Sequence, residues 1–334
     1  MLAYTLMSFA FAQEPLTLNL IAAGQKGTSV PTLQIKTHQH IPEVNGDLNC
    51  GGNRFKIGPT SSDNGQTLDI QLDVPTGQFN CSGTLNAKFE DGGTGSMPLS
   101  FQIQQFKPLK IKLDRSNVDL ENKTLTVGLD RPASRYLIQV LDVDGAIIGE
   151  GSKDVSPSEN LSPQLMDWTQ TDPDPAIIRV KAEDIHGFFA QLDLLPWHYN
   201  IPHEDVVFSS GSAEIQSDEV YKLTDVQAEI QKVVDRYSHI ATVNLYVGGY
   251  TDTVGNAASN TTLSQNRAKS IAKWFKDSGF QGEIYYQGFG EKGLAVATPD
   301  NTDEVRNRRA AYIVAAEAPP ISSDLPSSNW TKLP

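Results

Sequence analysis

One acidic and one basic side chain in the C-terminal third of the chain have the chemistry to bind a zwitterion. Asp252 follows the apolar run Thr242–Val247, and Arg267 lies in the helical pattern fifteen positions further on. A carboxylate accepts hydrogen bonds from an ammonium group, and a guanidinium holds a carboxylate through two parallel hydrogen bonds. We expect the two side chains to meet at one pocket rim. A plain salt bridge that holds the loop to the helix is the alternative interpretation.

The elements that must position this pair begin near Ile201, where the hydrophobic period changes from 2 to 3.6. We expect a first helix from Val220 to Tyr237, capped by Ser217, and a second helix that starts near Leu263. Thr262 and Gln265 have capping-box spacing, and Gly279 is placed to end the second helix. Strands are expected at 242–247, 283–287 and 309–314. This pattern predicts an α+β domain with its helices on one face of the sheet.

Five short motifs follow one another within residues 203–316, and their order and spacing resemble those of the OmpA-like peptidoglycan-binding family. They are Phe208–Ile215 as opening strand and turn, Gly249–Asp252 as G-x-T-D, Asn260–Ala268 as N-x-x-L-S-x-x-R-A, Gly288–Glu291 as G-x-G-E, and Asn307–Arg309 as N-R-R. The fold that this resemblance implies is β-α-β-α-β-β, with helices packed on a mixed sheet.

The resemblance also implies a ligand, the diaminopimelate of the peptidoglycan stem peptide, whose free end carries an ammonium and a carboxylate on one carbon. In this interpretation Asp252 holds the ammonium and Arg267 holds the carboxylate. Asn260 and Arg308 add supporting contacts. Two further candidates for support, Thr251 and Asn307, lie in the same motifs.

Two positions depart from the family's pattern. Gly211 stands where the family often has Asn or Asp, which removes one polar contact. The segment Thr302–Asn307 is shorter than the family's T-x-x-G-R-A-x-N and lacks its Gly-Arg pair. The second departure makes the contact from Arg308 the least supported of the predicted set.

The composition excludes several classes of partner. With 27 Lys and Arg against 40 Asp and Glu, the formal charge is −13. Nucleic acid is disfavoured because its binding needs clustered basic residues, and anionic lipid is disfavoured for the same reason. No run reaches the roughly 18 apolar residues of a helical membrane span. A length of 334 residues fits two or three domains.

The N-terminal residues predict export. Residues 1–12 are largely apolar and end in Ala10-Phe11-Ala12, the A-x-A form of a signal-peptidase site. Because no Lys or Arg precedes the apolar run, we interpret it as the tail of a signal peptide whose true start lies upstream; a buried N-terminal strand is the alternative. We therefore expect a periplasmic, outer-membrane-associated protein.

Residues 13–106 and 107–200 are each expected to form an all-β, sandwich-like domain. Alternating residues at 68–74 indicate a half-buried strand in the first, and the second is similar to immunoglobulin or fibronectin type III domains. Cys50 and Cys81 predict a disulfide that stabilises the first domain by about 3–4 kcal/mol. A thiol pair or half a zinc site is the alternative. An outer-membrane barrel across 13–200 is disfavoured because no Tyr or Trp lies between Tyr4 and Tyr136.

No catalytic or metal-binding pattern emerges from the rest of the chain. His38 and His40 share one strand face without a third ligand, and Asp142-Val143-Asp144-Gly145 fits a hairpin turn better than a calcium loop. We therefore predict a non-enzymatic protein without cofactor or metal, with the OmpA-like domain at 201–316 and a disordered tail at 317–334. The β domains are expected to meet the outer membrane or an envelope protein. A cell-wall hydrolase that this domain targets, or a barrel protein with a wall anchor, remains the alternative.

Overall fold

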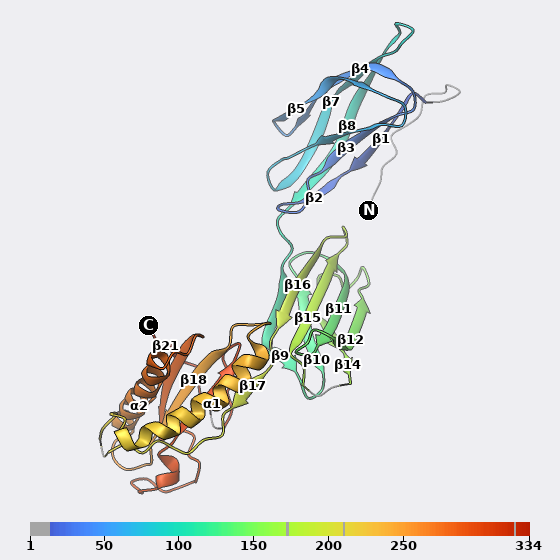
Figure 1. The fold of residues 1–334 in the computed structure, drawn as a ribbon. Coiled ribbons are helices and arrows are strands. Elements are labelled where there is room, and N and C mark those ends of the chain that lie inside the picture. The colour runs from blue at the N-terminus through green and yellow to red at the C-terminus, as the bar shows by residue number, and fades with distance from the viewer. Residues whose placement is uncertain (1–13, 172–173, 210, 324) are drawn as a thin grey trace. The chain divides into compact units, whose positions relative to one another are not determined.

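The computed structural model describes residues 14–171, 174–209, 211–323 and 325–334 (Figure 1). It is mostly β-sheet with few helices, and it divides into two compact units. One unit holds residues up to 138 with 151–169 and 180–192, and the other holds 139–150, 170–179 and 193–334. The expected signal peptide at 1–12 lies outside the described residues. Within the described part, every helix is too short or too polar to cross a membrane.

The first eight strands form two sheets that share one core. Strand β3 pairs with β1 and β6 in the first sheet, and the second sheet has the order β2-β8-β7-β4-β5. Leu33 and Ile35 from one sheet and Leu48 and Ile103 from the other lie in the same buried cluster, as in a sandwich. The strands are β1 (Leu16–Ile21), β2 (Ala23–Gln25), β3 (Thr32–Thr37), β4 (Ile41–Cys50), β5 (Asn53–Ser62), β6 (Thr67–Gln71), β7 (Gly77–Lys88) and β8 (Thr94–Phe106).

A disulfide joins Cys50 at the end of β4 to Cys81 in β7. The two residues lie directly opposite each other in the antiparallel register of these strands. Both are almost fully buried in the core of the sandwich. The bond therefore lies inside the core rather than at the surface.

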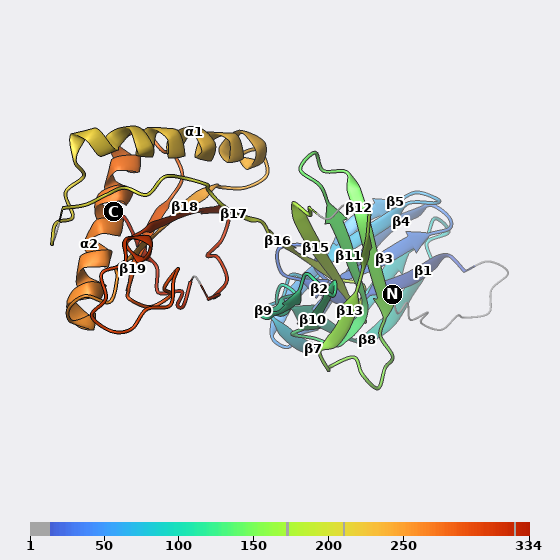
Figure 2. The ribbon, with the colours of Figure 1, turned by 90° about the horizontal axis from the view of Figure 1, so that it is seen from below.

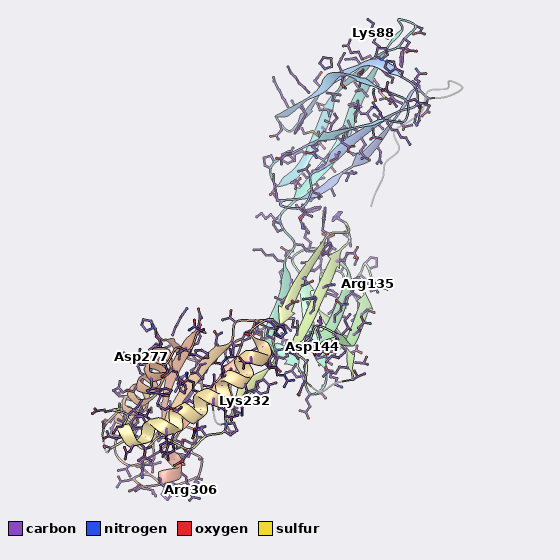
Figure 3. The ribbon with its side chains drawn as sticks, viewed as in Figure 1. Lys88, Arg135, Asp144, Lys232, Asp277 and Arg306 are labelled. Carbon is purple, nitrogen blue, oxygen red and sulfur yellow. A yellow bond between two sulfur atoms is a disulfide. The ribbon has the colours of Figure 1, made fainter. Side chains whose placement is uncertain are left out.

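The next eight strands form a second pair of sheets, of order β13-β10-β9 and β14-β12-β11-β15-β16. Between β11 and β12 the chain reverses at Asp142–Gly145, near the Asp144 label of Figure 3. Asp142 Oδ1 accepts hydrogen bonds from the backbone of Asp144 and Ala146, as in a tight turn. The strands are β9 (Ile111–Asp119), β10 (Thr124–Leu129), β11 (Ala133–Leu141), β12 (Ile147–Asp154), β13 (Gln164–Asp167), β14 (Thr169–Gln170), β15 (Ile177–Asp184) and β16 (Phe189–Leu194).

The C-terminal part combines a mixed sheet of order β17-β20-β18-β19-β21 with two α-helices, α1 and α2 (Figure 2). Strands β18 and β19 run parallel, whereas β20 is antiparallel to β18. Leu245 and Val247 of β18 pack with both helices, while Tyr246 faces the opposite side. The elements are β17 (His198–Asn200), the 3₁₀ turn η1 (Ser217–Glu219), α1 (Val220–Tyr237), β18 (Asn244–Tyr250), α2 (Ala257–Asp277), β19 (Ile284–Gly290), the 3₁₀ turn η2 (Val305–Asn307), β20 (Ala310–Ala315) and β21 (Thr331–Lys332).

Three local predictions for this region differ from the structure. The opening strand is β17, and the described residues of 208–215 contain no strand. Ser217 begins the turn η1 and caps no helix with its side chain. Helix α2 starts at Ala257, six residues before the predicted start, because Asn256 caps it by accepting from the backbone of Ala258 and Ser259. The end of α2 is as predicted, with Gly279 at φ +94°.

The tail at 317–334 is ordered where its composition predicts disorder. Its strand β21 pairs with the edge of β19. Leu325 is buried with Tyr246 and Phe289, and Trp330 packs against the same two rings. Two large apolar side chains therefore hold a segment whose Pro and Ser content alone favours disorder.

Candidate functional site

Asp252 lies in the loop that leaves the carboxyl end of β18. Its backbone is fixed on both sides: the Thr251 N–H donates to Gly290 O at 2.8 Å, and Asn260 Nδ2 donates to the carbonyls of Asp252 and Val254. The same amide of Asn260 also donates to Glu291 Oε2 at 2.9 Å. The loop is thereby tied to β19 and to the first turns of α2. Asp252 as a whole residue is 7% exposed.

Glycines in the G-x-T-D and G-x-G-E motifs let α2 approach the two parallel strands. A Cβ atom on Gly249 would lie 2.4 Å from Ser264 O, and one on Gly288 would lie 2.2 Å from Gln265 N. The close approach brings Ser264 Oγ to accept from Gly290 N at 2.9 Å. Gln265 Oε1 likewise accepts from Gly288 N. These motif residues therefore fix the position of the helix that carries Arg267.

Arg267 projects from α2 and is 8% exposed. Its Nε donates to Ser212 O at 3.0 Å, its Nη2 donates to Ser209 O at 3.4 Å, and its guanidinium lies over the Phe208 ring at 5.0 Å. Burial lowers the pKa of Arg267, the nearby Arg308 lowers it further, and Asp252 opposes both. An arginine so shifted still carries its charge at physiological pH.

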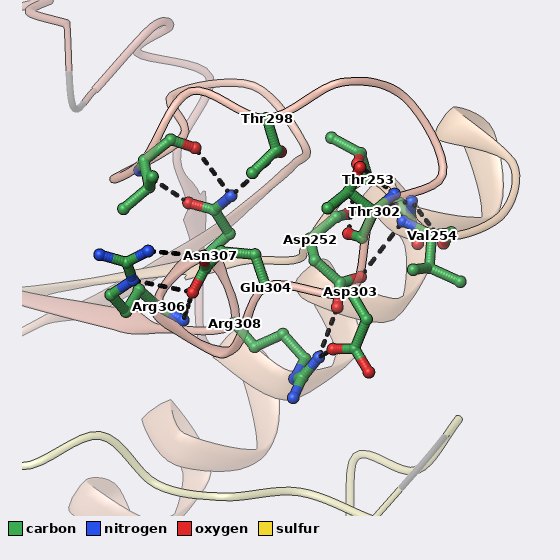
Figure 4. A network of polar contacts seen from close by, with 12 residues as sticks. Asp252, Thr253, Val254, Thr298, Thr302, Asp303, Glu304, Arg306, Asn307 and Arg308 are labelled. Carbon is green, nitrogen blue, oxygen red and sulfur yellow. Dashed lines mark hydrogen bonds and ion pairs between the residues drawn. The ribbon is translucent and has the colours of Figure 1, made fainter.

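The partner of Asp252 is Arg308, at the start of the approach to β20. Arg308 Nη1 donates to Asp252 Oδ2 at 2.6 Å, and the same nitrogen donates to Asp303 Oδ1 (Figure 4). We call Asp252, Asp303 and Arg308 the Arg308 cluster. Asp303 and then Asp252 raise the pKa of Arg308 above its ordinary value. The alternative interpretation, a direct salt bridge between Asp252 and Arg267, is not seen among the described contacts: Asp252 pairs with Arg308, and Arg267 lies within electrostatic range of both.

A small pocket of about 100 Å³ opens beside these groups. Three guanidinium side chains contribute to its lining, those of Arg267, Arg308 and Arg309, and Asp252 is not among the lining residues. The apolar part of the lining includes Phe208. The lining charge is positive, which suits an anionic group such as a carboxylate.

Two of the predicted supporting residues, Asn260 and Asn307, bond to loop segments, and Thr251 is buried. Asn260 donates its amide hydrogens to the protein acceptors described above. Asn307 holds Val296 from both sides, since its Oδ1 accepts from Val296 N at 2.9 Å and its Nδ2 donates to Val296 O at 3.0 Å. Thr251 is 2% exposed. None of the three lines the pocket.

Two features of the site were not predicted from the sequence. Asp303 has no counterpart in the five motifs, and the shortened Thr302–Asn307 segment was the only signal that pointed to it. The guanidinium of Arg309 lies 3.8 Å from the centroid of the Tyr250 ring and donates to Gly293 O. Arg309 thereby connects the end of β18 with the loop that follows β19.

The described residues hold no group of three or more His, Cys, Asp and Glu side chains that could bind a metal ion. The two histidines of the first sandwich have protein partners: His38 Nε2 lies 3.1 Å from Thr17 Oγ1, and His40 Nδ1 lies 2.6 Å from Asp63 Oδ1. The His38 and His40 pair is therefore a surface feature of the sandwich.

Comparison with known proteins places this region in a family. Residues 207–309 match the model of the OmpA family, and no family model matches the part of the chain before them. Outer membrane protein P5 of Haemophilus influenzae is 30% identical over 118 residues, which cover 35% of this chain and 30% of that protein. Outer membrane protein A of Buchnera aphidicola is 31% identical over 91 residues, or 27% of this chain and 25% of that protein. The chain thus spans under a third of the length of these relatives.

Solved structures with similarity to the chain include one OmpA-like domain and one periplasmic domain. The OmpA-like domain of FopA1 from Francisella tularensis is 20% identical, with a TM-score of 0.27, and the match covers 42% of this chain and 75% of that one. The periplasmic domain of MotB from Helicobacter pylori is 17% identical, with a TM-score of 0.29, and the match covers 36% and 83%. At residues 207–309, this chain carries a domain of the OmpA family.

Proposed function

We propose that the protein binds peptidoglycan non-covalently and non-enzymatically through the diaminopimelate of the stem peptide. The observation that supports this most is the meeting of charges of both signs at the ends of β18 and α2. Arg308 links Asp252 to the rim of a pocket that Arg267 also lines. In this proposal the guanidinium groups receive the ligand's carboxylate and Asp252 receives its ammonium.

The pocket suits an end group rather than a whole sugar chain. Its volume of about 100 Å³ accommodates a few heavy atoms, and Phe208 provides an apolar wall for a methylene chain. The remaining stem peptide and glycan would then stay outside. Such a site anchors a polymer by one repeating end group, which is the property a wall tether needs.

The rest of the chain would supply location and partners. We propose an exported protein of the periplasm that is associated with the outer membrane, with β domains at 13–106 and 107–200 and the wall-binding domain at 201–316. The β domains would then contact the outer membrane or an envelope protein. The family relationship to outer membrane proteins supports this placement.

Co-sedimentation of the full chain with purified sacculi tests the proposal. Wild type should sediment with diaminopimelate-containing sacculi, and Arg267→Ala, Arg308→Ala and Asp252→Asn should each bind at least about tenfold more weakly. Because Arg267 is buried, circular dichroism of each variant must match wild type before its binding is interpreted. Asp252→Asn preserves shape and keeps the test valid where an arginine variant misfolds.

Arg306→Ala is the matched control. Arg306, labelled in Figure 3, lies two residues before Arg308 in the chain. Its guanidinium donates hydrogen bonds to Glu304 and does not line the pocket. The substitution removes the same charge and should leave sedimentation unchanged. Equal retention of wild type and the three site variants would refute the site. Muropeptides released into the supernatant by native but not boiled protein would instead support the hydrolase alternative.

A further inference from the structure

The Arg308 cluster contains one more carboxylate than a single zwitterion site requires. Arg308 Nη1 has two N–H hydrogens and faces two carboxylates, Asp252 on one side and Asp303 on the other. The side chain of Asp252 is 10% exposed and that of Asp303 is 76% exposed. The same cation is therefore shared between a buried acid and an acid at the surface (Figure 4).

The backbone brings Asp303 to this position through one hydroxyl group. Thr253, next to Asp252, accepts at Oγ1 from Thr302 N at 3.0 Å and donates to Pro299 O at 2.7 Å. Its carbonyl also accepts from Asn301 N at 2.9 Å. Because Thr302 precedes Asp303, these bonds place the second carboxylate beside the first.

The short turn η2 then brings Arg308 back to meet Asp303. Glu304 caps η2 by accepting from Arg306 N at 3.1 Å, and Asn307 N donates to Glu304 O. The bonds from Arg306 lower the pKa of Glu304 to about 2, so this cap stays ionised at neutral pH. Asp303 and Arg308 thus lie on either side of a single turn that these bonds fix.

We propose that Asp303 is a positioning residue that sets the specificity of the site for a ligand with an ammonium group; this rests on the proposed function. Asp303 balances part of the charge of Arg308, so Asp252 keeps negative potential for the ligand's ammonium. Without Asp303, the charge of Arg308 is balanced by Asp252 alone. The site then attracts an ammonium less and a carboxylate more.

Binding of three stem tripeptides by the full chain, measured as Kd by NMR titration, tests this role. All three carry a C-terminal α-carboxylate and differ at the end of the last side chain. There meso-diaminopimelate offers an ammonium and a carboxylate, lysine offers only the ammonium, and 2-aminopimelate offers only the carboxylate. In Asp303→Asn, affinity for the lysine peptide should fall about fivefold, the upper range for an exposed ion pair. Affinity for the aminopimelate peptide should stay constant or rise.

Two further variants separate a local effect from a general one. Asp303→Glu keeps the carboxylate and should restore wild-type discrimination between the peptides. Asp300→Asn removes an exposed acid of the same loop, whose Oδ1 accepts only a local bond from Asn301 N among its described contacts, and should change none of the three affinities.

The outcomes are distinct. Equal weakening of all three peptides in Asp303→Asn would mean that the residue only supports the loop, and unchanged affinities would mean that it has no role; either result overturns the proposal. If Asp300→Asn changes the three affinities in the same way as Asp303→Asn, the effect comes from the net charge of the loop and not from the contact with Arg308, and the proposal is overturned. Failure of wild type to bind the diaminopimelate peptide would refute the proposed function itself, and this inference with it.

Discussion

Substitution of Gly249 by alanine should displace α2 from the sheet. The added Cβ would lie 2.4 Å from Ser264 O and 3.3 Å from Ala268 Cβ, whereas a carbon and a carbonyl oxygen ordinarily lie about 3.3–3.6 Å apart. The helix must therefore move by roughly 1 Å, and overpacking of this kind costs about 1–3 kcal/mol. Replacing glycine also lowers the conformational entropy of the unfolded chain, which stabilises the folded state by about 0.4–1 kcal/mol. Taking the middle of each range, we expect a net destabilisation of about 1.3 kcal/mol.

The neighbouring Gly248→Ala variant is the control for this prediction. Its Cβ would point to the opposite face of β18, where the nearest atoms belong to the side chains of Phe289 and Tyr250 at 3.1 and 3.4 Å. A ring can turn where a helix backbone cannot, so this variant should differ from wild type by less than about 0.5 kcal/mol.

Hydrogen exchange of the full chain measures both variants by region. Amides of α2 and β18 should exchange about tenfold faster in Gly249→Ala, the factor that corresponds to about 1.3 kcal/mol. Amides of β7 and β8, in the first sandwich, serve as an internal reference and should not change. Equal protection of α2 in Gly248→Ala and Gly249→Ala would show that the close approach of α2 does not require glycine.

Three other predictions concern separate parts of the chain. Replacing Cys50 and Cys81 by serine opens a loop with a sequence separation of 31 and should destabilise the first sandwich by about 3.7 kcal/mol on chain entropy, read from faster exchange in β4 and β7. Leu325→Ala should cost about 2 kcal/mol and expose β19 to exchange, because this side chain helps hold the tail. Burial tends to lower the pKa of His203, but its bonds to Asp205 and to two backbone carbonyls outweigh burial and raise it. Its stabilising contribution is full below about pH 6.5 and should be lost as pH rises through the raised pKa, so His203→Gln should flatten a plot of melting temperature against pH.

Periodicity was sufficient to predict the helices and the central strands of the C-terminal region. Helix α1 covers the predicted apolar face because apolar residues recur at helical spacing from Val220 to Tyr237, although its start lies after the predicted cap at Ser217. The start of α2 was wrong because Thr262 and Gln265 satisfied a capping-box pattern inside the helix, where Thr262 Oγ1 donates to Ala258 O. A local sequence pattern does not show which of two possible N-caps, here Asn256 or Thr262, begins the helix in the folded protein.

The first strand and the tail show the same limit at longer range. The family resemblance predicts an opening strand in the segment around Phe208, yet this segment provides carbonyls to Arg267 rather than ladder bonds to the sheet. Strand β17, with three residues, is too short for period-2 alternation to reveal it. The tail is ordered through Trp330 and its neighbours, so its order depends on the sheet face that it meets and not on its own composition.

At the candidate site, the motifs predict the residues that fix the backbone but not the pairing of the charged side chains. Most motif residues keep backbone in place: Gly249 admits the helix, Ser264 and Asn260 hold strand and loop ends, and Asn307 holds the Val296 segment. Such residues recur at fixed spacing because the backbone geometry that they serve is the same in every copy of the fold. The sequence therefore predicts the scaffold well from these positions.

Charge pairing is less constrained by that scaffold. The side chain of Arg308 is long, and the motifs do not predict which acid it pairs with. The partner of Asp252 therefore depends on where the preceding turn places Arg308. In this chain the turn is η2, and Asp303, which pairs with Arg308, directly precedes its capping residue Glu304. The proposed role of Asp303 assigns specificity to one of the two places that depart from the family's pattern, because a loop that changes length moves the charged side chains at its two ends while the helix and strands beneath it stay fixed.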